Sequence, residues 1–101
     1  MLNNSKHIRY VYLINRNKNY TFDVTKKHVG HLKKLDNNGQ LVLCGPFQDY
    51  DGGIVILIAD SIEDAKKIAE SDPFITDGFS TYELRTLELS NKENNHMGFG
   101  Q

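Results

Sequence analysis

The pattern of apolar positions changes its period several times along the chain. Residues 8–14 are rich in β-branched and aromatic side chains, residues 41–44 form a short apolar run, and residues 54–59 have the sequence IVILIA. Runs of this kind, bounded by turn residues, are typical of strands. Residues 81–89 alternate in side-chain character and predict a last strand.

Two segments between the predicted strands have the helical period instead. From residue 24 onward, apolar residues and two histidines recur on one helical face, and lysines project on the opposite side. The residues of the first face are Val24, His28, His31, Leu32 and Leu35. Gly39 follows and suits a left-handed helix end. Ser61 is the predicted N-cap of a second helix, which ends at Asp72-Pro73.

The predicted order is β-α-β-β-α-β, which is the ferredoxin-like α+β arrangement. It consists of four antiparallel strands with two helices on one face of the sheet. The strand at residues 54–59 is apolar on both faces, and one face carries Ile54, Ile56 and Ile58. A second layer must therefore cover the face without helices. A second copy of the chain is the simplest supplier, so we expect a homodimer that forms through the sheet faces.

Composition limits the partners and the compartment. The 12 Lys and Arg residues balance 13 Asp and Glu residues, which argues against nucleic acid as a partner. The single cysteine, Cys44, excludes an intramolecular disulfide and favours a reducing cytoplasm. The apolar run at residues 10–14 is too short for a signal sequence or a membrane span. We expect one domain over residues 1–90 and a flexible tail over residues 91–101, which has two glycines and no periodicity.

Several short motifs follow one another in a fixed order. They are HLKKL, a turn glycine, GPF, GG before an apolar strand, DPF after a capped helix, and an arginine in the last strand. This order resembles the YciI-like (YCII-related) family from about Arg9 to Leu89. The resemblance implies a ferredoxin-like subunit that dimerises sheet to sheet as a dimeric α+β barrel. It also implies an active site in which the HL histidine, His31, meets the DP aspartate, Asp72. Relatives in the wider barrel group include lyases, isomerases and oxygenases, so the resemblance implies a site and not a reaction.

Both residues of this pair also have a structural explanation. His31 faces the sheet, so without the resemblance it is first interpreted as a core-facing histidine bonded to a backbone carbonyl. Asp72 precedes Pro73 and would be a good N-cap for a short helical turn. Capping is compatible with catalysis, because the second carboxylate oxygen is left to orient His31. Such an imidazole could serve as a general acid or base, with its pKa set by charge and desolvation.

The other candidates would bind the substrate. His28 lies one turn before His31, and two histidines at this spacing can hold a metal. No third ligand stands at a recognisable spacing, so we expect no metal, haem or other cofactor, and we place His28 at the pocket edge. Arg85 would bind a substrate carboxylate, with a surface ion pair as the alternative. Tyr10 and Tyr12 share one strand face and could offer a hydroxyl. The remaining pocket candidates, also explained by strand termination or core packing, are Gly45, Pro46, Phe47 and Phe74.

Two functions are compatible with these residues. In the first, the chain is a small-molecule enzyme of the lyase, isomerase or hydrolase type. The His31–Asp72 pair then moves a proton without a cofactor. In the second, the chain is a non-catalytic dimeric module that binds a metabolite or serves a larger system. A small-molecule ligand is expected in both cases, and the residues leave the choice between enzyme and module open.

Overall fold

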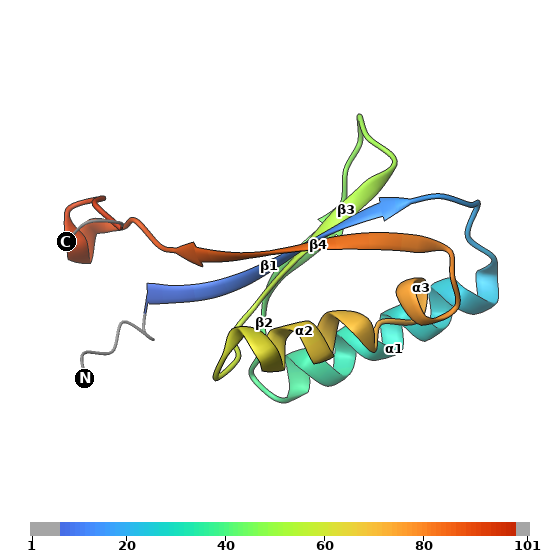
Figure 1. The fold of residues 1–101 in the computed structure, drawn as a ribbon, viewed down its shortest axis with the longest axis horizontal. Helices are drawn as coiled ribbons and strands as arrows, with labels where there is room; N and C mark the ends of the chain where they lie inside the picture. Colours follow the sequence, from blue (N-terminus) through green and yellow to red (C-terminus); the bar gives the residue numbers. More distant parts are fainter. Residues whose placement is uncertain (1–6, 99–101) are drawn as a thin grey trace.

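The computed structural model describes residues 7–98 and contains one sheet with three α-helices on one of its faces (Figure 1). The strands are β1 (Ile8–Arg16), β2 (Leu41–Pro46), β3 (Gly52–Leu57) and β4 (Ser80–Glu88). The helices are α1 (Phe22–Asn37), α2 (Ile62–Glu70) and the single turn α3 (Pro73–Thr76). The strand order is β2-β3-β1-β4, and every neighbouring pair is antiparallel. The predicted ferredoxin-like α+β fold is confirmed.

Local side-chain chemistry explains where the two longer helices begin and end. Thr21 is the N-cap of α1, and its hydroxyl accepts the backbone N–H of Val24 at 3.1 Å. The helix therefore begins two residues before the predicted apolar stripe. Gly39, with φ of 74°, follows α1 in the left-handed conformation that the sequence predicts. Ser61 caps α2 as predicted, because its hydroxyl accepts the N–H of Asp64 at 3.1 Å.

The two faces of the sheet have different surroundings. The face beneath the helices carries the most deeply buried side chains of the sheet, among them Tyr12, Val55 and Leu57. Within the part of the chain that the structure describes, no helix lies over the opposite face, here called the open face (Figure 1). By strand alternation it carries Val11, Leu13, Ile54, Ile56 and Leu43. Leu43 is 52% exposed. The prediction that β3 is apolar on both faces is confirmed, and the homodimer stays a prediction.

The segment after β4 forms a short turn of its own. Residues Lys92–Asn94 form a 3-10 turn, η2, whose N-cap is Asn91. Asn91 and Asn94 close a capping box, and the N–H of Gly98 donates to the hydroxyl of Ser90 at 2.9 Å. The predicted tail thus contains a 3-10 turn over Lys92–Asn94, and residues 99–101 lie outside the described residues. The flexibility of the tail stays a prediction. Within residues 7–98, no helix is long and apolar enough to span a membrane.

Candidate active site

The site is built around Asp72, which lies between α2 and α3 and is fully buried. Its Oδ1 accepts the backbone N–H of Phe74 at 3.0 Å, so Asp72 is the N-cap of α3, with Pro73 in the first turn, as the sequence predicts. An ionised carboxylate offers about four acceptor positions, and the cap uses one of them. The other positions are available to side chains from α1 and β1.

His28 on α1 is the histidine that contacts this carboxylate directly. Its Nδ1 lies 2.8 Å from Oδ1 and 3.0 Å from Oδ2 of Asp72. Its ring also stacks on Phe74, with centroids 3.9 Å apart and planes inclined by 13°. We expected His31 to meet Asp72 directly or through one water, whereas the structure gives the direct contact to His28 and links His31 to the carboxylate through Tyr12. The helical period places both histidines on the inner face of α1, but α3 packs at the level of the earlier turn.

His31 reaches the carboxylate through the hydroxyl of Tyr12. The Tyr12 oxygen lies 2.8 Å from Oδ2 of Asp72 and 3.2 Å from Nε2 of His31. Tyr12 comes from β1, is fully buried, and points beneath the helices. Tyr10, which we expected to line the substrate pocket, packs in the core one alternation step away. Strand alternation places both tyrosines on this face, and the structure brings the second of them to the site.

Burial and hydrogen bonding set the charges of the cluster. Burial alone would raise the pKa of the Asp72 carboxyl. The hydrogen bond and charge of His28, with further bonds from Phe74 and Tyr12, instead bring that pKa below its usual value. Burial and the Asp72 charge raise the pKa of the Tyr12 phenol strongly. Burial lowers the pKa of His31, and the charge of Asp72 offsets part of this effect. At neutral pH the cluster therefore contains an ionised carboxylate, a protonated phenol and a neutral His31.

The row of sheet residues that contains Tyr12 ends in an exposed cysteine on β2. Tyr12 pairs with Val55, and Val55 pairs with Cys44, so the three residues form one row beneath the helices. Cys44, at the end of this row, is exposed, and His31 is half-buried. Among residues 7–98, no group of three or more His, Cys, Asp or Glu side chains is arranged to hold a metal ion.

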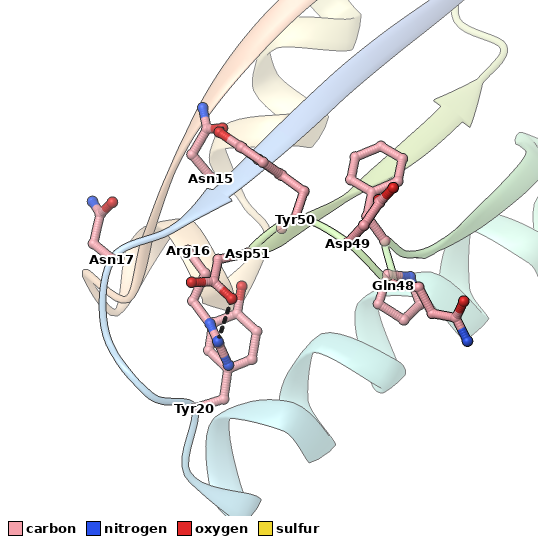
Figure 2. A pocket seen from close by; sticks show the side chains of 11 residues that line it. Asn15, Arg16, Asn17, Tyr20, Gln48, Asp49, Tyr50 and Asp51 are labelled. Atoms are coloured by element: carbon pink, nitrogen blue, oxygen red, sulfur yellow. Dashed lines mark hydrogen bonds and ion pairs between the residues drawn. The ribbon is translucent and has the colours of Figure 1, made fainter.

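A pocket of about 700 Å³ lies beside the β2–β3 hairpin, and Figure 2 shows its side chains. Pro46 and Phe47, two of the predicted pocket residues, line it. Arg16 also lines it, and its Nη2 donates to Oδ1 of Asp51 at 2.8 Å. The guanidinium lies over the ring of Tyr20, with Cζ 5.6 Å from the ring centroid. The pocket therefore combines aromatic walls with a paired cation.

A column of stacked groups connects this pocket to the Asp72 cluster. The Tyr20 ring stacks on Phe74, with centroids 3.8 Å apart and planes inclined by 8°. Phe74 stacks in turn on His28. The column thus runs from Arg16 through Tyr20 and Phe74 to His28. Phe74 contacts the cluster, whereas Pro46 and Phe47 lie at the far end of the column, and the contact of all three with a substrate stays a prediction.

Two further candidates do not join the cluster within this chain. Arg85 pairs across the strands with Val11, so its side chain projects from the open face. It donates to Glu83 at 2.9 Å and is 63% exposed, which corresponds to the alternative of a surface ion pair. Gly45 pairs with Ile54 and also lies on the open-face register. Both residues thus lie in the register of the face away from the helices, and their placement at a substrate pocket stays a prediction.

Comparison with known proteins gives three concordant results. The family model of the YCII-related domain matches residues 8–88. The uncharacterized protein YjpA of Bacillus subtilis (strain 168) is 30% identical over 80 residues, which cover 79% of this chain and 94% of YjpA. A similar solved structure is 5-chloro-2-hydroxyhydroquinone dehydrochlorinase (TftG) from Burkholderia phenoliruptrix AC1100, in complex with 2,5-dihydroxybenzoquinone. It has a TM-score of 0.56 and 21% identity, and the match covers 83% of this chain and 98% of TftG. The chain belongs to the YCII-related family.

Proposed function

We propose that the chain is a small-molecule enzyme that uses Asp72 and a histidine for general acid–base catalysis. The observation that carries this proposal is the fully buried carboxylate, which binds His28 directly and His31 through Tyr12. Capping α3 requires only one acceptor, and burying a charge costs free energy unless the charge is well paired. Interacting titratable groups with shifted pKa values are typical of functional sites.

In this proposal His31 exchanges the proton with the substrate. It is half-buried and therefore accessible, and burial lowers its pKa so that it is neutral and able to accept a proton near pH 7. His28 is held between the Asp72 carboxylate and the Phe74 ring. A positioned acid or base of this kind contributes on the order of 10² to 10⁴ in rate.

The reaction class to test first is an elimination. The structural neighbour TftG is a dehydrochlorinase, and removal of HCl from an organic substrate requires a base that takes a proton. That neighbour shares the fold at low identity, so it supports the choice of probe and leaves the substrate of this chain open. Isomerisation and hydrolysis follow as the next classes. The single cysteine is compatible with a cytoplasmic site of action.

We also propose that the chain forms a homodimer through the open face. Val11, Leu13, Ile54 and Ile56 form an aliphatic surface there that no helix covers. A second copy packed face to face would close the two sheets into the dimeric α+β barrel. An interface of this permanent kind buries more than about 2,000 Å² in total.

The test of the catalytic proposal combines binding and turnover. 2,5-Dihydroxybenzoquinone is titrated into the protein while the ring resonances of His28 and His31 are followed by NMR. 5-Chloro-2-hydroxyhydroquinone and related small halogenated enols are then assayed for chloride release. We expect the probe to shift the His31 resonances, and Asp72→Asn and His31→Gln to lower turnover by at least about 100-fold.

Asp77→Asn is the matched control, because Asp77 lies at the opposite end of α3 and is exposed. This variant should retain turnover. Probe binding without turnover in eliminations, isomerisations and hydrolyses would favour the alternative, a metabolite-binding or accessory module. Turnover that survives both Asp72→Asn and His31→Gln would contradict the proposed residues.

A further inference from the structure

The hydroxyl of Tyr12 occupies an unusual position, because it contacts both the carboxylate of Asp72 and the ring of His31. We infer that Tyr12 is a positioning residue that holds His31 with its proton on Nε2 and leaves Nδ1 as the atom that exchanges protons with a substrate. The inference rests on the proposed function for its catalytic meaning, and the protonation states themselves follow from the geometry.

The first step is to locate the single proton of the Tyr12 hydroxyl. If that proton pointed to His31, the Tyr12 oxygen would face Oδ2 of Asp72 at 2.8 Å with no proton between them. Two acceptors at this distance in a fully buried place repel each other. The carboxyl is ionised and offers only acceptors. The Tyr12 proton therefore lies on the side of Asp72.

The second step fixes the ring of His31. The Tyr12 oxygen has donated its proton and can only accept along the 3.2 Å contact, so Nε2 of His31 must carry the hydrogen. A neutral imidazole has one ring proton, so Nδ1 of His31 is then an unprotonated acceptor. Nδ1 is therefore the atom of the half-buried ring that can accept a proton.

The same carboxylate fixes a hydrogen on the other ring nitrogen in His28. Its Nδ1 lies within 3.0 Å of both Asp72 oxygens and must therefore carry a hydrogen. The two imidazoles thus bind one carboxylate through different ring nitrogens, one directly and one through Tyr12. The ionisable groups that act on His31 are Asp72, His28 and Lys34.

The proposed step conserves all protons. A bond from hydrogen to the substrate breaks, its electron pair stays on the substrate, and an N–H bond forms at Nδ1 of His31. The ring becomes an imidazolium whose Nε2–H still donates to Tyr12, while Tyr12 still donates to Asp72. The carboxylate therefore stabilises the new positive charge through a polarised hydroxyl, and no proton passes through Tyr12.

The first measurement needs no variant. Long-range ¹H–¹⁵N correlation of the histidine rings, recorded well above the imidazole pKa, reports which nitrogen carries the proton. We expect His31 protonated at Nε2 and His28 protonated at Nδ1. A His31 ring protonated at Nδ1 would overturn the inference, whether or not any Tyr12 variant folds.

The second measurement uses Tyr12→Phe, which removes only the hydroxyl. We expect the His31 pKa to fall by about one pH unit, because the imidazolium loses its hydrogen-bond acceptor, and the neutral ring to become a mixture of tautomers. Tyr82→Phe is the control, because that ring lies edge-on to Tyr12 at 6.5 Å while its hydroxyl donates to Glu70. It should leave the His31 resonances unchanged. An unchanged His31 pKa and tautomer in Tyr12→Phe would refute the positioning role.

These readouts separate the inference from the proposed function. Ring protonation is measured without turnover, so an inactive chain with the expected tautomers would contradict only the proposed function. With an active chain, Tyr12→Phe should lower kcat at least tenfold and change KM little, because the hydroxyl touches His31 and not the substrate. Full kcat in this variant would contradict only the role of Tyr12.

Discussion

The face of the sheet that the helices cover contains a buried carboxylate, a phenol and two imidazoles, whereas the open face carries mainly aliphatic side chains. Tyr12 and Val11 illustrate this contrast, because they are neighbours on β1 and point to opposite faces. Tyr12 is fully buried among polar partners, and Val11 lies on the face without a helix. The covered side thus contains a polar cluster within an apolar core, whereas the uncovered face presents aliphatic side chains without a helix over them.

This difference shows how a chain of 101 residues can house a polar site. A small domain has little apolar area to spare, and every polar group beneath the helices reduces what that layer contributes. In the proposed homodimer, a second copy would cover the open face and add its apolar area to the buried surface. Under these two proposals, the covered face carries the catalytic groups. The open face would contribute the apolar burial that offsets the cost of placing polar groups in a small core.

The largest expected effect comes from charging the centre of the open face. Ile56→Asp places a carboxylate among Val11 and Leu43, and an unpaired charge at an interface costs about 3 kcal/mol or more. The dimer dissociation constant should rise by at least about 100-fold. Sedimentation velocity measures this change, and Ile56→Val is the control that should remain dimeric. A native chain that is monomeric at micromolar concentration would contradict the proposed role of this face.

The next effect concerns how the covered face responds to acid. The folded pKa of Asp72 lies below 3.8, so its stabilisation is present above that value and is lost as the pH falls through the folded pKa. The folded pKa of His31 lies below 6.5, so the unfolded chain binds the proton first and stability also falls as the pH drops below 6.5. Both groups therefore make acid destabilising, in two separate windows.

Asp72→Asn should distinguish these windows in urea unfolding experiments at several pH values. The loss of stability below about pH 4 should disappear in this variant. The loss of stability below about pH 6.5 should grow, because the Asp72 charge no longer raises the His31 pKa. We expect changes on the order of 1–3 kcal/mol. Asp77→Asn should keep both windows. If Asp72→Asn loses as much stability below about pH 4 as the native chain, Asp72 is not the group responsible.

The smallest expected effect is at Arg85, on the edge of the open face. Its pair with Glu83 is exposed on both sides, so Arg85→Gln should change the free energy of unfolding by less than about 0.5 kcal/mol. It should also leave the His31 ring resonances unchanged, because the two side chains project from opposite faces. A clear shift of the His31 pKa in this variant would mean that the two faces are coupled through a partner subunit.

The element order could be predicted because each element has its own local signal. The strands follow from β-branched runs, α1 follows from its helical stripe, and α2 follows from its Ser61 cap. The sequence also contains a local signal for the direction of the Arg85 side chain. The predicted strand alternates Tyr82 and Leu84 with Glu83 and Arg85, and the apolar pair belongs beneath the helices. The outward direction of Arg85 could therefore be deduced from the sequence.

The contacts of the cluster are harder to predict, because they depend on tertiary distances. His28 and His31 share one helical face, and only the level at which α3 packs on α1 decides which of them meets Asp72. Tyr10 and Tyr12 share one strand face, and the registers with β3 and β4 decide which reaches the helices at that point. Sequence periodicity predicts the direction in which a side chain points. A contact also depends on the level along the element at which the neighbouring element packs.

The double duty of Asp72 has a consequence for how family members are compared. The same carboxylate caps α3 and holds the imidazoles, so selection for folding alone would keep an Asp-Pro pair at this place. A relative that retains it is not thereby marked as an enzyme. The residues that discriminate are those without a structural duty in the cap, foremost His31 and Tyr12. A relative that lacks both residues but keeps the aspartate would be expected to have the same fold without the proposed catalytic activity.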